Sequence, residues 1–516
     1  SHRGQRRGQQ RQNVLYSRCI SYVPVWQNVA EHLVSSLNES ERFTVKFTRT
    51  AVALGAAALI AAGSVPAVQH FAEGNADQPV TTLSPAATSV QTSLPTPTTS
   101  TTTSPTTSST TSTSTSPATS TPTSSQETPK AAETTDATDA TSTSTSPTAP
   151  TTEDPEPTDE HPNVKPLVEA PKTFQGKDQA WVRILARHRD TWDNEAISVK
   201  SESMERDIPV AIFYATDENG DRKENAPTVY LLNGAGGSEQ DTDWVAQAYN
   251  ELEKTYKNSG VNVVIPMEGA FSYYVDWAAE PPVDTDTNAF FHGKQMWSTF
   301  LAHELPQAVE PYMKADEEHR AVAGLSMAAT SVLLLAEHNP GLYDAVGSFS
   351  GCASTSRPIP WGFVDLTVSR GAPNVMSPEY IFGERGSDYN RHYDALVNAA
   401  ALKGTAVYLS TGTGLAGESD TPGYLKDRLI NQYGVDPDSA SARALSNAMT
   451  LQVEGGVIEA AMNACTHDLM VKMRANDVDV THAELRNVGT HSWASWRDDV
   501  KLSFDKVFKK ALGLEQ

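Results

Sequence analysis

The chain has 516 residues and a formal net charge of −23 at neutral pH, with 63 acidic against 40 basic side chains. A chain with this excess of acidic side chains has no basic stripe that could neutralise phosphates, so it is not expected to bind nucleic acid. From residue 75 to residue 165 Thr, Ser and Pro dominate, and large apolar side chains are almost absent. That segment cannot bury enough surface to offset its conformational entropy, which excludes it from a folded core.

The segment before this low-complexity stretch has the pattern of an export signal. Lys46 and Arg49 precede an apolar, alanine-rich run over 51–62, and the small residues at 65–67 suit cleavage by a signal peptidase. The apolar run is short for a membrane span, and an uncleaved anchor is the alternative to a cleaved signal.

These compositional boundaries predict four segments. We expect an over-extended N-terminus over 1–44, a signal peptide over 45–67, a disordered Thr/Ser/Pro-rich linker over 68–165 and one folded domain over 166–516. The folded part has ordinary globular composition and is long enough for one large core.

Within the folded part, short β-branched and apolar runs alternate with helical segments. The predicted strands cover 208–214, 228–232, 261–266, 320–323, 345–350, 405–410 and 478–486. The predicted helices cover 244–258, 293–314, 328–338, 388–402 and 437–474. This alternation predicts an α/β fold with a mostly parallel central sheet and helices on both faces.

Two connections complete this prediction. The first two strands are compatible with an antiparallel hairpin whose turn includes Asp221. Residues 352–387 are rich in Pro, Gly and Ser and are predicted as loops above the carboxyl edge of the sheet. That edge is where open α/β sheets bind ligands.

The most informative motif is G-L-S-M-A at 324–328, between a predicted strand and a predicted helix. A G-x-S-x-G/A motif in this context indicates a nucleophile elbow, the sharp turn that presents a serine hydroxyl in an α/β-hydrolase. Small residues on both sides allow strand and helix to pack around the strained serine. Ser326 is therefore the candidate nucleophile.

A serine nucleophile needs a base, and the base needs an acid to orient it. His491 follows the last predicted strand in G-T-H-S-W at 489–493, the place where this fold carries its histidine. Three residues remain open for the acid on spacing alone: Glu418, Asp420 and Glu454.

A loop of small residues follows the second predicted strand at 233–237. It is a candidate for one of the two backbone N–H groups of an oxyanion hole, and the N–H of Met327 is the candidate for the other.

The cysteines indicate an oxidising compartment. Cys19 lies in the doubtful N-terminus, which leaves Cys352 and Cys465 as an even pair in a domain predicted to be exported. One disulfide is the default interpretation, with two buried thiols as the alternative. The sequence has neither a Cys/His cluster with metal-ligand spacing nor a phosphate-binding glycine loop, so no metal and no cofactor is predicted.

With these residues assembled, the segment 205–510 resembles the mycolyltransferases, the antigen 85 family and its corynebacterial relatives. L-L-N-G at 231–234 is similar to the family's L-L-D-G, and Y-V-D-W at 274–277 to its Y-T-D-W. The family also has counterparts of V-V-I-P at 263–266 and of M-W-S-T-F-L at 296–301. Its G-L-S-M and G-T-H-S-W motifs are reproduced in this chain.

The resemblance assigns further roles. The family's catalytic Glu lies in L-E-G-F-V-R, which is similar to V-E-G-G-V-I at 453–458 and favours Glu454 as the acid. The family's second oxyanion-hole donor corresponds to Ala235 in this chain. The resemblance also implies substrate contacts, and these fall on Asn233, Gly236, Ser354, Ser492 and Trp493.

The implied activity is serine-dependent acyl transfer in the α/β-hydrolase superfamily. A mycolyl group would pass from trehalose monomycolate, through an acyl-serine, to trehalose monomycolate, arabinogalactan or a protein hydroxyl. A plain exported esterase is the alternative. The implied setting is a mycolate-containing cell envelope, with trehalose mycolates and envelope acceptors as partners, and the protein is expected to be a monomer.

Two departures bear on the sugar site. The mycobacterial members carry Arg where this chain has Gly236, and Asp where it has Asn233. Both changes remove charged groups from the presumed trehalose loop, so the way in which the acceptor is held is open.

Overall fold

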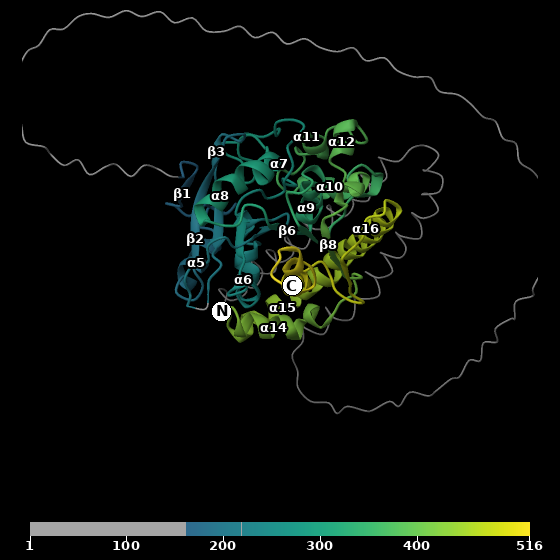
Figure 1. Cartoon of the computed structure of the whole chain (residues 1–516). Coiled ribbons are helices and arrows are strands. Elements are labelled where there is room, and N and C mark those ends of the chain that lie inside the picture. Colours follow the sequence, from purple (N-terminus) through teal and green to yellow (C-terminus); the bar gives the residue numbers. More distant parts are fainter. Residues whose placement is uncertain (1–160, 218, 516) are drawn as a thin grey trace, which may run out of the picture. The chain divides into compact units, whose positions relative to one another are not determined.

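The computed structural model describes residues 161–217 and 219–515 of the chain (Figure 1). The predicted leader and signal peptide, and all but the last residues of the predicted linker, lie outside the described residues. The fold begins slightly earlier than expected, because strand β1 (Val164–Pro166) already pairs with β2.

The described chain is built on a nine-stranded sheet in the order β1-β2-β3-β5-β4-β6-β7-β8-β9. The first three pairings, β1–β2, β2–β3 and β3–β5, are antiparallel, and the remaining five are parallel. The strands after β1 are β2 (Asn194–Ser201), β3 (Arg206–Phe213), β4 (Thr228–Leu232), β5 (Asn262–Pro266), β6 (Arg320–Leu325), β7 (Ala345–Phe349), β8 (Ala406–Thr411) and β9 (His482–Leu485).

Helices connect these strands. The longer ones are α5 (Ala180–His188), α6 (Trp244–Tyr256), α8 (Leu305–Met313), α9 (Met327–His338), α10 (Pro358–Val368), α14 (Pro422–Asn431), α15 (Pro437–Thr450), α16 (Gly456–Ala475) and α17 (Trp493–Ser503). The shorter ones are α7 (Trp297–Thr299), α11 (Pro378–Phe382), α12 (Asp388–His392), α13 (Ala395–Asn398) and α18 (Lys509–Ala511). Single turns are η1 (Ser238–Gln240), η2 (Phe300–Glu304), η3 (Ala399–Leu402), η4 (Glu418–Asp420), η5 (Leu451–Gly455) and η6 (Phe504–Phe508).

The sheet separates two hydrophobic clusters, because successive side chains of a strand point to opposite faces. In β4, Tyr230 and Leu232 join the cluster beneath α8 and α9, while Val229 and Leu231 join the cluster beneath α5, α6 and α17. All five residues of β4 are buried, as expected for a central strand covered on both faces. The predicted α/β fold with a mostly parallel sheet and helices on both faces is confirmed.

The predicted hairpin between the first two strands is wrong. β3 pairs with β2 from Asn194↔Phe213 to Ser201↔Arg206, and its other neighbour is β5. β4 lies instead between β5 and β6, because its continuous apolar sequence suits a position covered on both faces.

The segment 352–387 is also more regular than predicted, since it contains α10 and α11. Each of these helices has a proline at its first turn, Pro358 and Pro378. A proline at the first helical position leaves no intrahelical hydrogen bond unmade, so it starts a helix there rather than breaking one.

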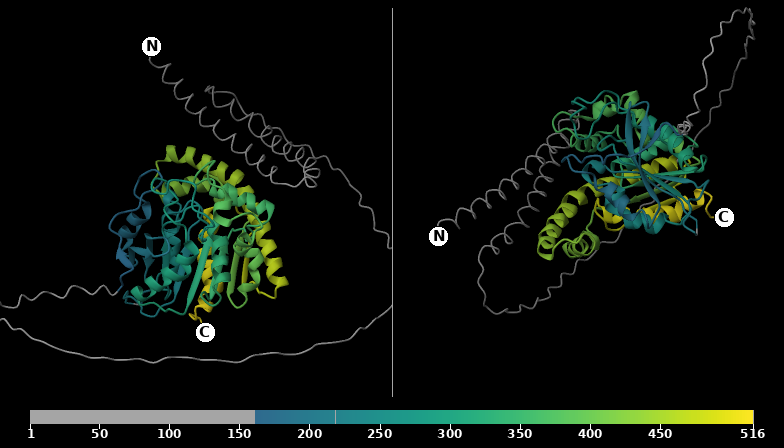
Figure 2. Two further views of the ribbon diagram at one scale, coloured as in Figure 1. Left: turned by 90° about the horizontal axis from the view of Figure 1, so that it is seen from above. Right: turned by 90° about the vertical axis from the view of Figure 1, so that its left-hand side faces the viewer.

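Helices α14 and α15 form a pair after β8. In the left view of Figure 2 this yellow-green pair lies across one end of the domain, beyond the ends of the strands. In the part of the chain that the structure describes, no helix combines the length and apolar character required to cross a bilayer.

Candidate active site

Ser326 lies at the turn between β6 and α9 with φ 56° and ψ −118°. A positive φ is costly for a residue with a Cβ and persists only where the surroundings enforce it. A Cβ on Gly324 would lie 2.7 Å from the carbonyl oxygen of Ala328, so strand and helix approach too closely for a larger residue at 324. The predicted sharp turn around Ser326 is confirmed.

Ser326, His491 and Glu459 form a continuous hydrogen-bonded chain. His491 Nε2 lies 2.8 Å from Ser326 Oγ, and His491 Nδ1 lies 2.8 Å from Glu459 Oε2. The histidine belongs to the loop between β9 and α17, and its ring packs edge-on against Trp496 at 4.9 Å. Such a chain can take a proton from the serine hydroxyl onto the imidazole while the carboxylate stabilises the resulting charge.

The carboxylate of Glu459 is fully buried and held by several donors. Oε1 accepts hydrogen bonds from the Ser350 hydroxyl at 2.8 Å, the Thr411 hydroxyl at 3.1 Å and the Gly412 N–H at 2.7 Å. Burial acts to raise the pKa of Glu459, but the hydrogen bond and charge of His491, with the Gly412 and Ser350 donors, outweigh it and lower the pKa below its ordinary value. Glu459 is therefore ionised at neutral pH.

The prediction of Glu454 as the acid is wrong. Its carboxylate is 41% exposed and pairs with Arg370 at 2.6 Å. Glu454 belongs to the π-helical turn η5, and Glu459 lies five positions further along the chain. Five residues correspond to roughly 140° around an α-helix, so the two carboxylates point to different sides.

A sequence signal for Glu459 does exist in α16. The buried residues of this helix are Gly456, Glu459, Met462, Thr466, Leu469 and Met473. They recur at intervals of three or four, the spacing of a helix face that packs inward. Glu459 is the charged member of this otherwise uncharged stripe, and a buried carboxylate requires a partner.

Asp420, another of the candidate acids, holds the histidine loop through hydrogen bonds. Its Oδ1 accepts from the Thr490 hydroxyl at 2.8 Å and from the Ser492 hydroxyl at 3.4 Å, and its Oδ2 accepts from the Gly417 N–H at 2.9 Å. Asp420 thus holds the residues on both sides of His491. Glu418, the third candidate, is exposed in the same turn.

The two predicted oxyanion donors border the serine. Met327 is the first residue of α9, where a backbone N–H has no partner within the helix. Ala235 follows Gly234, at which a Cβ would lie 3.6 Å from the Ser326 Cβ, and its own carbonyl accepts the Phe271 N–H at 2.9 Å. The loop that carries Ala235 is thus fixed beside Ser326.

Two of the predicted substrate contacts, Asn233 and Ser354, have side chains that are buried and bonded to protein groups. The Asn233 amide donates to Pro266 O at 2.9 Å and accepts the Trp244 N–H at 3.0 Å. The Ser354 hydroxyl donates to Asp394 at 3.0 Å. Each therefore stabilises a loop.

Gly236 is partly exposed but tightly enclosed on its Cβ side. A Cβ there would lie 2.3 Å from Thr242 Oγ1 and 2.7 Å from Gln240 Oε1. A larger residue at 236 would have to displace these side chains.

A cavity of about 300 Å³ opens beside the histidine loop. Ser492 and Trp493, the remaining predicted contacts, both line it and directly follow His491. The other lining residues come mainly from α14, α15 and α17: Gln247, Ser419, Tyr424, Leu425, Arg428, Leu429, Tyr433, Asn447, Thr450, Leu451, Ala494 and Arg497.

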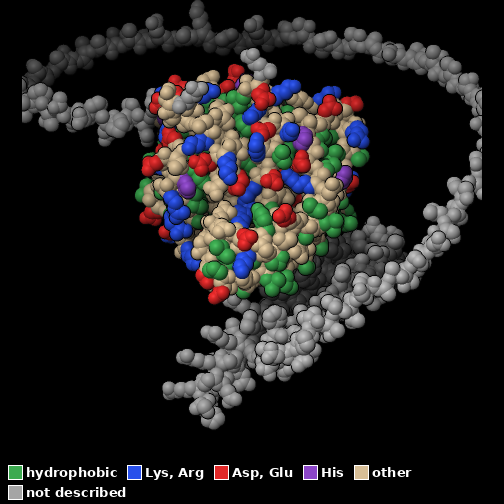
Figure 3. All heavy atoms as spheres, turned by 90° about the horizontal axis from the view of Figure 1, so that it is seen from below, with side chains coloured by type: hydrophobic (Ala, Val, Ile, Leu, Met, Phe, Trp, Pro, Cys, Tyr) green, Lys and Arg blue, Asp and Glu red, His purple; other side chains and the backbone are tan. Residues whose placement is uncertain are grey.

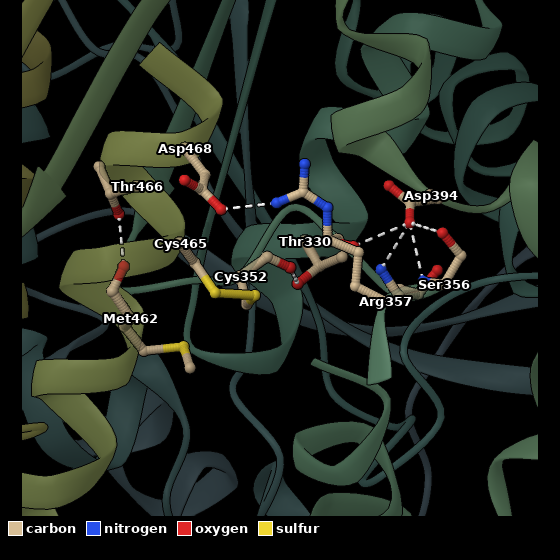
Figure 4. The surroundings of a disulfide bond; sticks show 11 residues. Thr330, Cys352, Ser356, Arg357, Asp394, Met462, Cys465, Thr466 and Asp468 are labelled. Carbon is tan, nitrogen blue, oxygen red and sulfur yellow. Dashed lines mark hydrogen bonds and ion pairs between the residues drawn. A yellow bond between two sulfur atoms is a disulfide. The ribbon is translucent and has the colours of Figure 1, made fainter. Parts of the chain in front are cut away.

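Cys352 and Cys465 form a disulfide, as predicted. Figure 4 shows the bridge between α16 and the segment that follows β7, with the Arg357–Asp468 ion pair beside it at 2.7 Å. Ser350, two residues before Cys352, contacts Glu459, six residues before Cys465. The disulfide therefore ties together the two segments that hold the acid of the candidate site.

A mostly parallel sheet, a serine at the turn after a central strand and a histidine after the last strand define the chain as an α/β-hydrolase. The family model described as "Putative esterase" matches residues 201–502, more than half of the chain. The chain belongs to this esterase family.

Among curated proteins, the diacylglycerol acyltransferase/mycolyltransferase Ag85A of Mycobacterium leprae is 28% identical over 246 residues, covering 47% of this chain and 70% of that protein. Ag85B of M. leprae is 32% identical over 174 residues, covering 34% of this chain and 49% of that protein. Among solved structures, M. tuberculosis MPT51 is similar with a TM-score of 0.44 at 21% identity, covering 62% of this chain and 98% of that chain. The family and the relatives support acyltransferase or esterase activity.

Proposed function

We propose that the protein is a serine-dependent acyltransferase that moves a mycolyl group from trehalose monomycolate to a second hydroxyl. The observation that carries this proposal is the hydrogen-bonded chain from Ser326 through His491 to the buried Glu459. The substrate class comes from the mycolyltransferase relatives, to which this chain is 28% and 32% identical.

In the first half-reaction, the Ser326 oxygen attacks the ester carbonyl while His491 Nε2 takes its proton. The negative charge that develops on the carbonyl oxygen is stabilised by the Ala235 and Met327 N–H groups. The tetrahedral intermediate then collapses, the ester C–O bond breaks, and His491 returns the proton to the trehalose oxygen. A mycolyl-serine ester remains.

In the second half-reaction, a hydroxyl of the acceptor loses its proton to His491 and attacks the acyl-serine. The acceptor is a second trehalose monomycolate, an arabinogalactan hydroxyl or a protein hydroxyl. Ser326 leaves with the proton from His491, and the acyl group stays on the acceptor. Glu459 keeps the imidazole oriented and stabilises its positive charge in both steps.

We also propose that this reaction takes place outside the cytoplasm, in a mycolate-containing cell envelope. The Cys352–Cys465 disulfide supports this location, because such bonds persist in oxidising compartments.

Intact-mass spectrometry of the full chain incubated with trehalose monomycolate tests the proposal. A mycolate-sized adduct on Ser326, discharged to a trehalose glycolipid when acceptor is added, is the expected result. Ser326→Ala should abolish the adduct and lower turnover by a factor of about 10³ to 10⁶. Wild-type turnover in that variant would refute the role of Ser326.

The esterase alternative is favoured by the description of the family itself. Water would replace the acceptor hydroxyl in the second half-reaction. Free mycolic acid released at a rate independent of acceptor would establish the esterase and reject the transferase.

A further inference from the structure

The cavity beside the histidine loop has basic side chains in its lining. The face of the molecule shown in Figure 3 carries acidic and basic side chains next to one another. Among the residues that the structure describes, the cavity lining contains two arginines, Arg428 and Arg497, and no aspartate or glutamate. The chain as a whole has 63 acidic and 40 basic residues, so the charge of the lining is opposite in sign to the net charge of the chain.

Arg497 is a largely buried cation that forms no ion pair with any residue that the structure describes. It is 8% exposed, its Nε donates to the Gln247 carbonyl at 2.7 Å, and its guanidinium lies 6.0 Å from the centre of the Trp493 ring. Its Nη groups donate to no other residue in the described part of the chain. These Nη groups are absent from the described chain's buried, unpaired atoms, so they are accessible at the cavity and can donate to a bound oxyanion.

Arg428 also lines the cavity and belongs to α14. Its Nε donates to Gln432 at 2.7 Å and its Nη2 to the Tyr433 hydroxyl at 3.2 Å, both neutral groups. Burial and the charge of Arg428 lower the pKa of Arg497 to about 10. Glu251 on α6 also acts on Arg497 through its charge, but within 161–217 and 219–515 neither arginine has a carboxylate at ion-pair distance.

Most of the remaining lining side chains are suited to a hydroxyl-rich ligand, and Leu425, Leu429, Leu451 and Ala494 add apolar surface. Serine and threonine hydroxyls, tyrosines and the amides of Gln247 and Asn447 supply hydrogen-bonding groups, and Trp493 supplies a flat apolar face. A volume of about 300 Å³ matches one sugar ring with a charged substituent rather than a long acyl chain.

We propose that this cavity binds a hydroxyl-rich small molecule that carries a carboxylate or a phosphate, with Arg428 and Arg497 holding the anion. Guanidinium groups recognise both oxyanions through paired N–H donors. Ser492 and Trp493 directly follow His491, so a ligand in the cavity lies beside the candidate site. That the ligand is an acyl acceptor rests on the proposed function; its binding does not.

Isothermal titration with three matched probes tests the binding: glucose 6-phosphate, glucuronate and glucose. The full-chain Ser326→Ala variant is used, so that no acyl transfer interferes. At least one of the two anionic sugars should bind ten times or more tightly than glucose, and this preference should shrink as salt is added. The anionic sugar that binds identifies the oxyanion.

Two variants connect the preference to the cavity. Arg428→Gln, at a half-buried position, should weaken binding of the anionic sugar tenfold or more and leave glucose unaffected. Arg443→Gln is the control, because it removes an exposed charge from α15 without altering the lining. Equal binding of charged and neutral sugars, no binding of either anion, or an equal loss in both variants would overturn the proposal.

The proposed function has a separate readout in wild-type protein. Labelling of Ser326 by a fluorophosphonate reports the nucleophile and does not depend on Arg428 or on any bound sugar. If Ser326 is labelled but the protein shows no preference for the anionic sugars, the cavity proposal alone is rejected. If the anionic sugars are preferred but Ser326 is not labelled, the proposed chemistry alone is rejected.

Discussion

Glu459 and His491 are joined by a hydrogen bond of 2.8 Å although one lies within α16 and the other in the loop before α17. The same region is also held through the backbone, because the His491 N–H donates to the Gly455 carbonyl at 3.0 Å. Helix α16 and the turn before it thus fix both the backbone and the ring of the histidine.

This relationship predicts that Glu459→Gln lowers kcat by a factor of about 10⁴, because the amide no longer holds the ring in its productive tautomer. KM should change far less. Turnover of a soluble acyl ester by the purified full chain measures the effect.

Glu454→Gln is the matched control, since that residue is exposed and paired with Arg370. It should retain activity within about twofold, given how little exposed ion pairs contribute. A larger loss in the Glu454 variant than in the Glu459 variant would restore Glu454 as the acid.

The contacts of Asp420 predict a second, smaller effect on kcat. An amide in its place turns one acceptor into a donor opposite the Thr490 and Ser492 hydroxyls or the Gly417 N–H. Asp420→Asn should therefore loosen the histidine loop and lower kcat about 10- to 100-fold, in the range of positioning groups, with a smaller change in KM.

Circular dichroism separates this positioning role from loss of fold, since the secondary structure should be unchanged. Glu418→Gln, in the same turn but exposed, is the control and should be unaffected. Equal kcat in the two variants would show that Asp420 does not position the loop.

The sequence predicts the local features of the site correctly and fails for features that depend on long-range packing. The turn at Ser326 depends on a few consecutive residues, because only small side chains fit between β6 and α9, and it was predicted correctly. His491 was found by its position after the last strand. Both features are fixed by neighbours in the chain.

Glu459 was missed because its role depends on the rotation of a long helix. The motif similarity pointed to Glu454, but the π-helical turn η5 and the packing of α16 turn Glu459 inward instead. The predicted hairpin failed for a similar reason, since the insertion of β5 between β3 and β4 is a long-range pairing that no short pattern encodes.

Glu239 predicts a pH effect on stability. Burial raises the pKa of its carboxyl to about 7, although the Gly269 and Ala270 N–H groups donate to it at 2.9 Å. In the unfolded chain the pKa returns to about 4.5. Between pH 4.5 and pH 7 the folded state binds the proton of Glu239 more tightly than the unfolded state does. The contribution of this proton to the free energy of unfolding is therefore complete below about pH 4.5 and is lost as the pH rises through 7.

Glu239→Gln should be free of this loss, because its amide is neutral at every pH and keeps an oxygen toward the two N–H groups. Urea unfolding at pH 5 and at pH 7.5 should show that wild type loses more stability on this rise than the variant. Exposed Glu280→Gln, which removes one carboxylate from the surface, should behave as wild type. Parallel pH curves for wild type and Glu239→Gln would refute the raised pKa.

The disulfide predicts a large effect on stability, because it joins residues 113 apart in the sequence. On the chain-entropy model, a bridge over a loop of that length stabilises the folded state by about 4 to 5 kcal/mol. The double variant Cys352→Ala/Cys465→Ala should lose roughly this amount in urea unfolding. Asp468→Asn breaks the neighbouring exposed ion pair with Arg357 and should lose ~1 kcal/mol or less.

The disulfide variant should also lose activity under conditions in which it is still folded. Without the bridge, the Ser350 segment and α16 are no longer tied together, and the hydrogen bond from the Ser350 hydroxyl to Glu459 depends on packing alone. Slower labelling of Ser326 by a fluorophosphonate, at a urea concentration where both proteins are folded, would show this loosening. Equal labelling rates would mean that the disulfide stabilises the fold without aligning the acid.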